Sequence, residues 1–274
     1  MADSSSARGQ VELPSIDISR PHTARVWNYL LGGKDNYLAD RESGEALIAL
    51  LPDIADAARA DRQLLIRVVR YLAGETGIRQ FLDIGTGLPT ANNTHEVAQV
   101  TAPECRIVYV DNDPLILAHA RALLTSSPEG ATDYIHADLE DTERVLREAG
   151  RTLDFTQPVA LMLLGILNHI MDDDEAYAIV SQLVDALPPG SYLVITHPTT
   201  DFRAEAMMAA MKLWNEGGGV PPVTARTRAE IARFFDGVEL LEPGVVSSSL
   251  WRPEPSEIGT PVEVFEYGGV GRKL

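Results

Sequence analysis

A glycine pair follows an acidic residue at the end of a short apolar run. The segment over residues 81–90 reads FLDIGTGLPT, with Asp83 two positions before Gly85. Glycine in such a place lets the chain turn sharply and brings a ligand against the backbone. Asp83 would repel a pyrophosphate and attract a cationic group. The loop therefore predicts a binding site for a cationic ligand, with a simple tight turn as the alternative.

Two further acids end the next two apolar runs. Asp111 stands 28 residues after Asp83, close to the spacing at which related folds place a carboxylate on ribose hydroxyls. Asn112 beside it can reach an adenosine, and Asp138 can accept a hydrogen bond from an adenine amino group while Leu139 packs on the ring. Taken singly, each acid could be a helix cap or a solvated turn residue.

The ligand that fits these residues joins an adenosine to a positively charged tail. S-adenosylmethionine is such a ligand, because its sulfonium and ammonium groups outweigh one carboxylate. A nicotinamide dinucleotide fits less well, since Thr90 occupies the place of the third glycine in the dinucleotide fingerprint. We expect Gly85, Thr86 and Gly87 to lie against the cofactor.

One histidine follows the fourth apolar run, which ends before Gly165. If the ligand is S-adenosylmethionine, the expected reaction is methyl transfer. This reaction is an in-line displacement in which orientation of the reactants contributes most, and a base is needed only where the acceptor must lose a proton. His169 has a side chain suited to that task. It could instead be a helix-entry residue that bonds a nearby carbonyl group. His197 is a second candidate for the base.

A regular alternation of short apolar runs and longer amphipathic stretches positions these residues. It predicts a mostly parallel sheet with helices on both faces. The expected strands are Gln80–Ile84, Arg106–Val110, Tyr134–Ala137, Pro158–Leu164 and Ser191–Thr196, followed by Val238–Leu241 and Val262–Tyr267. The expected helices between and after them are Thr94–Val100, Leu115–Leu124, Glu143–Glu148, Asp174–Leu187 and Arg203–Trp214, with another that opens at Thr227 and has Glu230 as its capping-box partner.

The amino-terminal third has a different pattern from the rest. Residues 1–12 are small and polar and predict a flexible tail. From Arg20 to Arg70 the pattern is helical, broken at Gly32-Gly33 and Pro52, which predicts two to four helices within a lid region over residues 13–76. Residues 77–274 form the expected sheet domain.

Composition excludes several classes of protein. The formal charge of −17 disfavours a nucleic-acid partner, because duplex binding depends on basic side chains. No apolar run reaches the length of a membrane span, and the first residues lack the apolar stretch of a secretion signal, so we expect a cytoplasmic location and no membrane partner. Cys105 is the single cysteine, so neither an internal disulfide nor a cysteine-based zinc site is expected, and we expect no metal.

The residues resemble the S-adenosylmethionine-dependent methyltransferase superfamily. They are more closely similar to an actinobacterial family of predicted methyltransferases long catalogued as a domain of unknown function. The segments that carry this resemblance are Ser19–Tyr37, Phe81–Thr90, Tyr109–Pro114 and Gly268–Lys273.

The resemblance implies a Rossmann-like methyltransferase fold with a seven-stranded, mostly parallel sheet, one antiparallel strand near its end and an amino-terminal helical lid. It implies that Asp83, Gly85 and Gly87 hold the methionine end of the cofactor, Asp111 the ribose, and Asp138 with Leu139 the adenine. Gly165, after the fourth strand, is also expected to contact the cofactor. The lid implies cofactor contacts from Arg25, Tyr29, Asn36 and Tyr37, with Arg25 on the methionine carboxylate.

Two departures from the superfamily pattern affect these expectations. Pro89-Thr90 stands where many members have a glycine, so the next helix is expected to begin later. A one-residue offset would place Asn168, in place of His169, where small-molecule O-methyltransferases have a catalytic histidine.

The leading hypothesis is a methyltransferase that acts on an unidentified small molecule, as a monomer or a homodimer. The alternatives are a sensor that binds S-adenosylmethionine or S-adenosylhomocysteine without turnover, and a nicotinamide-dependent oxidoreductase on a related sheet.

Overall fold

An eight-stranded sheet forms the centre of the computed structural model, which describes residues 17–113, 115–116, 125–254 and 261–274. Its strand order is β3-β2-β1-β4-β5-β8-β6, with β7 paired to β8. The strands are β1 (Gln80–Ile84), β2 (Arg106–Asp111), β3 (Ala131–His136), β4 (Ala160–Leu164), β5 (Tyr192–Pro198), β6 (Glu239–Leu240), β7 (Val246–Ser247) and β8 (Glu266–Arg272). The first five are mutually parallel, and β8 is antiparallel to β5. The carboxyl ends of five successive strands therefore share one edge.

Helices cover both faces of this sheet. The helices are α1 (Thr23–Leu30), α2 (Leu38–Leu50), α3 (Ile54–Gly74), α4 (Thr94–Thr101), α6 (Thr142–Ala149), α7 (Asp173–Asp185), α8 (Ala204–Glu216) and α9 (Arg228–Arg233), with short 3-10 turns η1 (Leu167–His169) and η2 (Ser248–Leu250). Successive strand residues point to opposite faces. Leu82 and Val108 pack with α6, α7 and α9, whereas Phe81 and Ile107 pack with α3 and α4.

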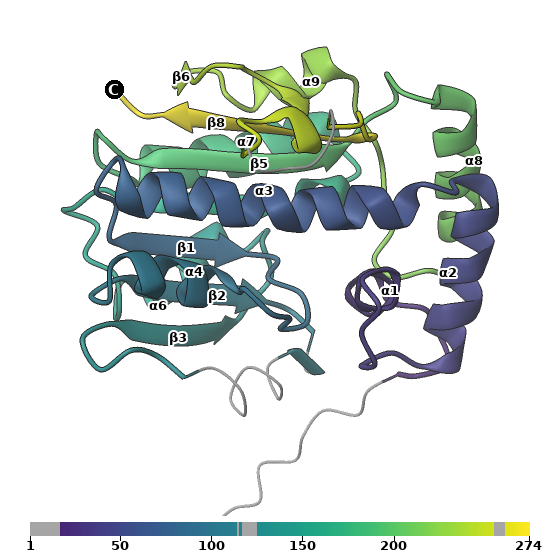
Figure 1. The fold of residues 1–274 in the computed structure, drawn as a ribbon, viewed down its shortest axis with the longest axis horizontal. Coiled ribbons are helices and arrows are strands. Elements are labelled where there is room, and N and C mark those ends of the chain that lie inside the picture. Colours follow the sequence, from purple (N-terminus) through teal and green to yellow (C-terminus); the bar gives the residue numbers. More distant parts are fainter. Residues whose placement is uncertain (1–16, 114, 117–124, 255–260) are drawn as a thin grey trace, which may run out of the picture.

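Three helices gather at the carboxyl edge instead of on a face. Figure 1 shows α1, α2 and α8 beyond the arrowheads of β1 and β5, while the long α3 runs across one face of the sheet. A separate apolar core joins these helices: Leu30 of α1 and Leu47 of α2 pack with Met207 and Trp214 of α8. They form a roof over the edge where the strand-end acids lie.

The sequence predicted the five parallel strands and the antiparallel strand near the end, and the structure confirms both. The last strand was predicted wrongly at Val262–Tyr267, because β8 begins at Glu266 and contains most of the closing glycine segment. Glycine lets α3 pack closely on this strand, since a Cβ on Gly268 would lie 2.7 Å from Cδ1 of Leu64 on α3. The short strand β7 was not predicted.

Other expectations have mixed outcomes. The capping box of Thr227 and Glu230 is confirmed, and α4 begins at Thr94, four residues after Thr90. The tail over residues 1–12 and most of the helix expected at Leu115–Leu124 lie outside the described residues. Within the described ranges, no helix is both long and apolar enough to cross a membrane, and no cluster of metal-ligating side chains is present.

Candidate active site

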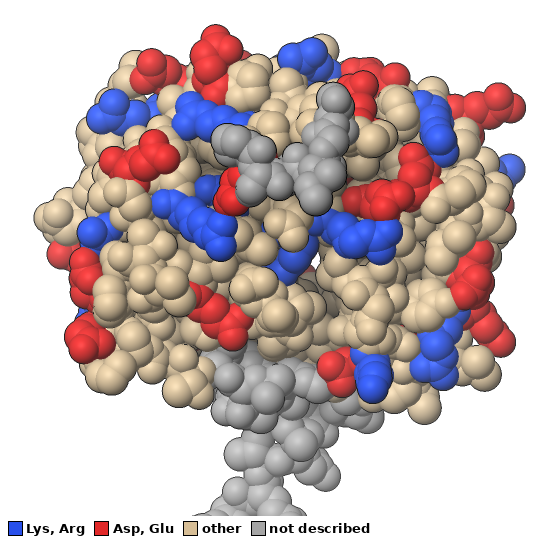
Figure 2. All heavy atoms as spheres, in the orientation of Figure 1, with Lys and Arg blue, Asp and Glu red and all other residues tan. Residues whose placement is uncertain are grey.

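A cavity of about 330 Å³ lies between the carboxyl ends of the strands and the roof helices. It brings together the residues that the sequence pattern predicted at the ends of the first four strands. These lining residues are Asp83, Gly85, Thr86, Gly87, Asp111, Asn112, Asp138, Leu139, Gly165 and His169. Figure 2 shows the molecule hollowed near the centre of the face drawn.

The glycine loop crosses the floor of this cavity. Gly85 has φ +79°, and a Cβ there would lie 2.6 Å from Cβ of Ile166. A side chain at this position would therefore be both strained and in collision. The backbone N–H of Gly87 donates to Asp111 Oδ2 at 2.9 Å. The loop and the end of β2 are thus held together by the predicted ribose carboxylate.

Asp111 is buried and already accepts two backbone hydrogen bonds. Besides Gly87, the N–H of Asp113 donates to its Oδ1 at 2.9 Å. Burial raises the pKa of Asp111 to about 6, and the two backbone hydrogen bonds offset part of that rise. Each carboxylate oxygen has a second lone pair, so the group can still accept from ribose hydroxyls.

Asp83 lies deeper, on the face of the sheet that α3 and α4 cover. The hydroxyl of Thr94 donates to its Oδ2 at 2.6 Å. Burial raises the pKa of Asp83 to about 6, an effect that the Thr94 hydrogen bond and the charge of Arg62 reduce. A ligand cation in the cavity would favour the ionised form of this carboxyl.

The third strand end is more exposed. Asn112 Nδ2 donates to Asp138 Oδ2 at 2.9 Å, and the N–H of Glu140 donates to Asp138 Oδ1 at 3.1 Å. Leu139 is buried beside them. The arrangement presents one carboxylate next to one apolar side chain, which is the pair expected for an adenine ring.

His169 lies on η1 and lines the cavity, and its Nδ1 is 3.0 Å from the carbonyl oxygen of Pro222. A carbonyl oxygen only accepts, so Nδ1 carries the proton and Nε2 is left as the acceptor. Burial lowers the pKa of His169 to about 4, which makes the ring a weak base. The bond to a nearby carbonyl, one of the two alternatives from the sequence, is present, and the role of His169 as a base stays a prediction.

His197 has a different environment, and its candidacy as the base was wrong. It is fully buried, Nδ1 lies 2.8 Å from the carbonyl oxygen of Pro198, and Nε2 accepts from Nη1 of Arg226 at 2.8 Å. Both ring nitrogens are therefore occupied. It is not among the residues that line the cavity.

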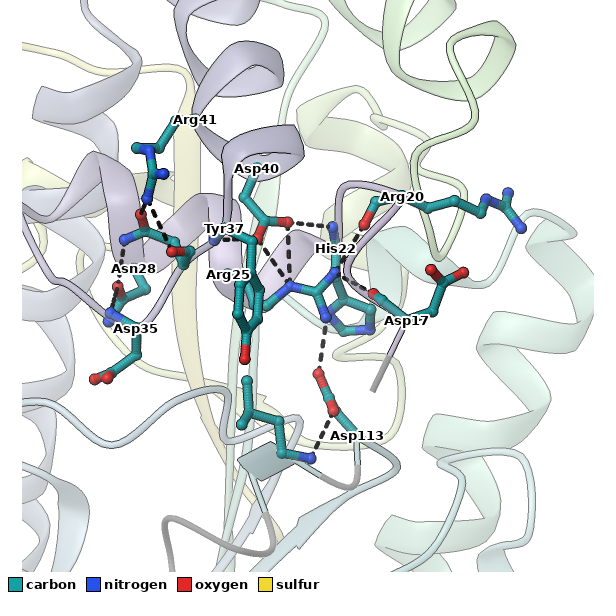
Figure 3. A network of polar contacts seen from close by, with 12 residues as sticks. Asp17, Arg20, His22, Arg25, Asn28, Asp35, Tyr37, Asp40, Arg41 and Asp113 are labelled. Carbon is teal, nitrogen blue, oxygen red and sulfur yellow. Dashed lines mark hydrogen bonds and ion pairs between the residues drawn. The ribbon is translucent and has the colours of Figure 1, made fainter. Parts of the chain in front are cut away.

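Arg25, Tyr29, Asn36 and Tyr37, expected as lid contacts, do not line the cavity. Figure 3 shows the reason for Arg25: its guanidinium lies between the Asp40 carboxylate and the backbone of the preceding turn. Nε donates to Asp40 Oδ2 at 2.9 Å, and Nη2 donates to the carbonyl oxygens of residues 17 and 20. These contacts leave Arg25 facing the interior of the roof.

The other three expected lid residues have partners within the roof or next to the glycine loop. Tyr29 bonds Glu45, and the side-chain amide of Asn36 donates to Oδ1 of Asn28 at 2.9 Å. Tyr37 packs against an apolar cluster that includes Leu88. The residues of α1 and the turn before it that do reach the cavity include His22, Ala24, Trp27 and Asn28.

Comparison with known proteins identifies the family of this chain. The model of the S-adenosyl methyltransferase family matches residues 9–274. The chain belongs to the S-adenosyl methyltransferase family. The match covers the roof helices as well as the sheet, which confirms the resemblance found in the sequence. It also confirms S-adenosylmethionine as the cofactor and a Rossmann-like methyltransferase as the fold.

Two solved structures in this family are similar over almost their whole length. A DUF574 family protein from Streptomyces avermitilis is 42% identical, with a TM-score of 0.89 over 95% of this chain and 100% of that chain. A predicted methyltransferase from Thermobifida fusca is 44% identical, with a TM-score of 0.85 over 95% and 97%. TnmH is 17% identical, with a TM-score of 0.51 over 93% of this chain and 65% of that chain, and shows a shared fold alone. No curated protein matches the chain.

The cavity suits the cofactor of this family chemically. Its carboxylates match the cationic centres and hydroxyls, and one lining cation, Arg62 on α3, remains for a carboxylate group. Arg62 Nη2 donates to Asn93 Oδ1 at 3.1 Å, while its buried Nε has no hydrogen-bond partner among the described residues. A half-buried, incompletely satisfied guanidinium is suited to a bidentate contact with a carboxylate.

Sequence reasoning missed Arg62 and two buried acids in the same cavity, Asp61 and Glu266. A signal was present for Asp61, which falls on the apolar stripe of α3 between Ala58 and Leu65. Glu266 stands two positions after Val264, the spacing at which strand residues share one face, and both side chains are buried. A charged residue at a core position of an amphipathic pattern is the feature that identifies both.

Proposed function

We propose that this methyltransferase acts on a small molecule held between the strand ends and the roof helices. The observation that supports the proposal is a single cavity that joins the strand-end residues to apolar side chains under the roof. Trp27, Met207, Met211, Trp214 and Phe265 line that second part. A space of about 330 Å³ between the strand ends and the roof helices lies within the range of small-molecule pockets.

We propose that the cofactor lies across the carboxyl edge. Asp138 and Leu139 hold the adenine, with Asn112 beside them, and Asp111 holds the ribose. The methionine end then passes over the loop from Gly85 through Thr86 to Gly87 and beside Gly165. The cofactor supplies an electrophilic methyl group, and the protein's part is to orient the two reactants and exclude water from them.

We propose Arg62 in place of Arg25 as the partner of the methionine carboxylate. Arg62 lines the cavity, and its charge acts on Asp83, the buried carboxyl below the glycine loop. An ammonium group near Asp83 and a carboxylate near Arg62 would satisfy both side chains at once. Arg25 is already neutralised by Asp40.

The roof is proposed to be smaller than the lid expected at residues 13–76. α3 packs along the sheet through Leu64, Val68 and Leu72, which belong to the same core as Phe81. We therefore propose α1, α2 and α8 as the roof, and α3 as part of the sheet domain. A location in the cytoplasm, and a monomeric or homodimeric state, stay predictions.

Electrostatics also support a small-molecule acceptor. The net charge is −17, and Figure 2 shows acidic and basic side chains interspersed across the face drawn, without one continuous basic surface. A polyanionic backbone would gain little from such a surface.

The proposal is tested by the transfer of a radiolabelled methyl group from S-adenosylmethionine into host-cell extract. We expect label in the low-molecular-weight fraction, and none with boiled enzyme. Label confined to protein or nucleic acid would contradict the proposal. Binding of S-adenosylhomocysteine without label in any fraction would indicate the sensor.

Cofactor affinity is expected to fall as the pH drops from 7 to 5. The pKa values of Asp83 and Asp111 are raised to about 6, so below that pH protons compete with the ligand for each carboxylate. Protonation of each of these two carboxyls should therefore weaken cofactor binding roughly tenfold at pH 5 relative to pH 7. Calorimetric titration with S-adenosylhomocysteine from pH 5 to 8 measures this, and Asp111→Asn should reduce the slope. A flat profile in the wild type would contradict it.

His169→Ala is expected to slow methyl transfer without a change in affinity for S-adenosylhomocysteine. The pKa of His169 is lowered to about 4, so the ring is neutral and weakly basic at physiological pH. We expect a loss of about tenfold, below the effect of a well-matched general base. The rate of label transfer into the same extract measures it, and an unchanged rate would assign His169 to structure alone.

A further inference from the structure

Three buried polar side chains lie in the cavity away from the predicted adenosine residues. Asp61 is 8% exposed, Asn168 is 8% exposed and Glu266 is 3% exposed, and all three line the cavity. Asp61 Oδ1 and Asn168 Oδ1 have no hydrogen-bond partner among the described residues. Both free atoms are acceptors, and the Thr196 hydroxyl is the donor that acts on the two acids among the described residues.

The sheet topology places this group at the acceptor side of the site. Glu266 begins β8 opposite Pro198 at the carboxyl end of β5, and Asn168 lies on η1 after β4. Asp111 ends β2 and Asp138 follows β3, on the far side of β1 in the strand order. Asp61 acts electrostatically on Glu266 from α3.

Asp61 and Glu266 form an acidic pair that no protein cation neutralises in the part of the chain that the structure describes. Neither Asp61 nor Glu266 forms an ion pair within 4.0 Å there. Arg62 follows Asp61 on α3, but its charge acts more strongly on Asp83 than on Asp61. Under the proposed function Arg62 also receives the methionine carboxylate, which leaves the pair without a counter-charge.

Two uncompensated carboxyls are unfavourable in an apolar setting. Burial raises the pKa of Asp61, and burial together with the charge of Asp61 raises the pKa of Glu266 well above its usual value. Buried acids of this kind persist where a ligand supplies the missing partner. Trp27, Trp214 and Phe265 line the same cavity, and aromatic rings also favour cations.

We propose that Asp61, Glu266 and Asn168 hold a protonated amine of the methyl acceptor, whose apolar body packs against the roof helices. This inference rests on the proposed small-molecule function and narrows the substrate class to apolar amines. An ammonium group has three donors and no acceptor, which matches three acceptor side chains. The amine serves here as a recognition group, whichever atom is methylated.

The test uses amine and alcohol pairs of the same shape on the full-length protein saturated with S-adenosylhomocysteine. The probes are 2-phenylethylamine with 2-phenylethanol and tryptamine with tryptophol, titrated by ligand-observed NMR. We expect the wild type to bind at least one amine about tenfold or more tightly than its alcohol. Equal binding of both members, or binding of neither amine, would overturn the proposal.

The variants are Glu266→Gln and Asp61→Asn, with Glu239→Gln on the exposed β6 as the matched control. We expect both site variants to lose the preference for the amine and to keep the affinity for the alcohol and for S-adenosylhomocysteine. The control should behave as the wild type. Weaker S-adenosylhomocysteine binding in the site variants would assign the pair to the methionine ammonium and overturn the proposal.

Thermal unfolding gives a second measurement on the ligand-free protein. Because the pKa of Glu266 is raised in the folded state, its ionisation favours unfolding as the pH rises. Glu266→Gln should therefore melt higher than the wild type, by a margin that grows from pH 5 to 8. A margin that shrinks would show that the carboxylate has a partner in the fold. Label that enters only macromolecules would instead refute the small-molecule function, whatever the amine preference.

Discussion

Asp40→Ala is expected to lower the free energy of unfolding by about 3–5 kcal/mol, the range for removal of one partner from a buried ion pair. Asp40 is 0% exposed and Arg25 is 3% exposed, so the guanidinium would be left charged and without its carboxylate in the interior of the roof. The same carboxylate accepts from the N–H groups of His22 and Tyr37, at 2.9 and 2.8 Å. Two attachments of α1 to α2 and the N-cap bond of α2 itself are lost together.

Urea unfolding monitored by circular dichroism measures this effect. The control is Asp56→Ala, because Asp56 pairs with Arg59 at the surface, where the two side chains are 61% and 60% exposed. That pair should contribute less than about 1 kcal/mol. If both variants lost the same small amount, the Arg25–Asp40 pair would not hold the roof together.

The roof pair also bears on the cofactor site. His22 Nδ1 lies 3.4 Å from Asp113 Oδ2, and Figure 3 shows the two residues side by side below the Arg25–Asp40 pair. Asp113 in turn donates its N–H to Asp111. Asp40→Ala should therefore also weaken binding of S-adenosylhomocysteine in conditions where the variant is folded.

Asp111→Ala is expected to weaken cofactor binding by roughly 1.5–3 kcal/mol, the scale of hydrogen bonds to a charged group. The structure adds a second reason, because Asp111 Oδ2 fixes the glycine loop through the N–H of Gly87. Loss of the carboxylate removes the proposed ribose acceptors and releases the loop that faces the methionine end. The effect should therefore lie toward the upper end of that range.

Calorimetry with S-adenosylhomocysteine measures the change in affinity. Asp236→Ala removes an exposed acid from the same chain and serves as the control for net charge. It should leave the affinity as in the wild type. An Asp111→Ala variant that binds as tightly as the control would mean that the ribose lies elsewhere.

The strand-end site could be predicted from sequence because its position follows from topology. Apolar runs identify parallel strands, and the carboxyl ends of such strands meet at one edge, so Asp83, Asp111 and Asp138 had to converge. Local pattern alone carried this conclusion. No long-range packing had to be known.

The roof could not be predicted in the same way. Arg25 and Arg62 both lie on helices before the sheet, and the sequence does not show which arginine is neutralised within the roof. Only the packing of α1 on α2 shows that Arg25 pairs with Asp40, fifteen positions away, while Arg62 remains at the cavity. The end of the last strand was missed for a related reason, since only the packing shows that Gly268 lies within β8, where it lets α3 approach closely.

A crystal structure of the protein with S-adenosylhomocysteine tests the central claim most directly. We predict density for the nucleoside along the edge from Asp83 to Asp138, with both ribose hydroxyls within hydrogen-bond distance of Asp111 and the adenine against Leu139. Density for the ligand at any other place, or a ribose turned away from Asp111, would contradict the account.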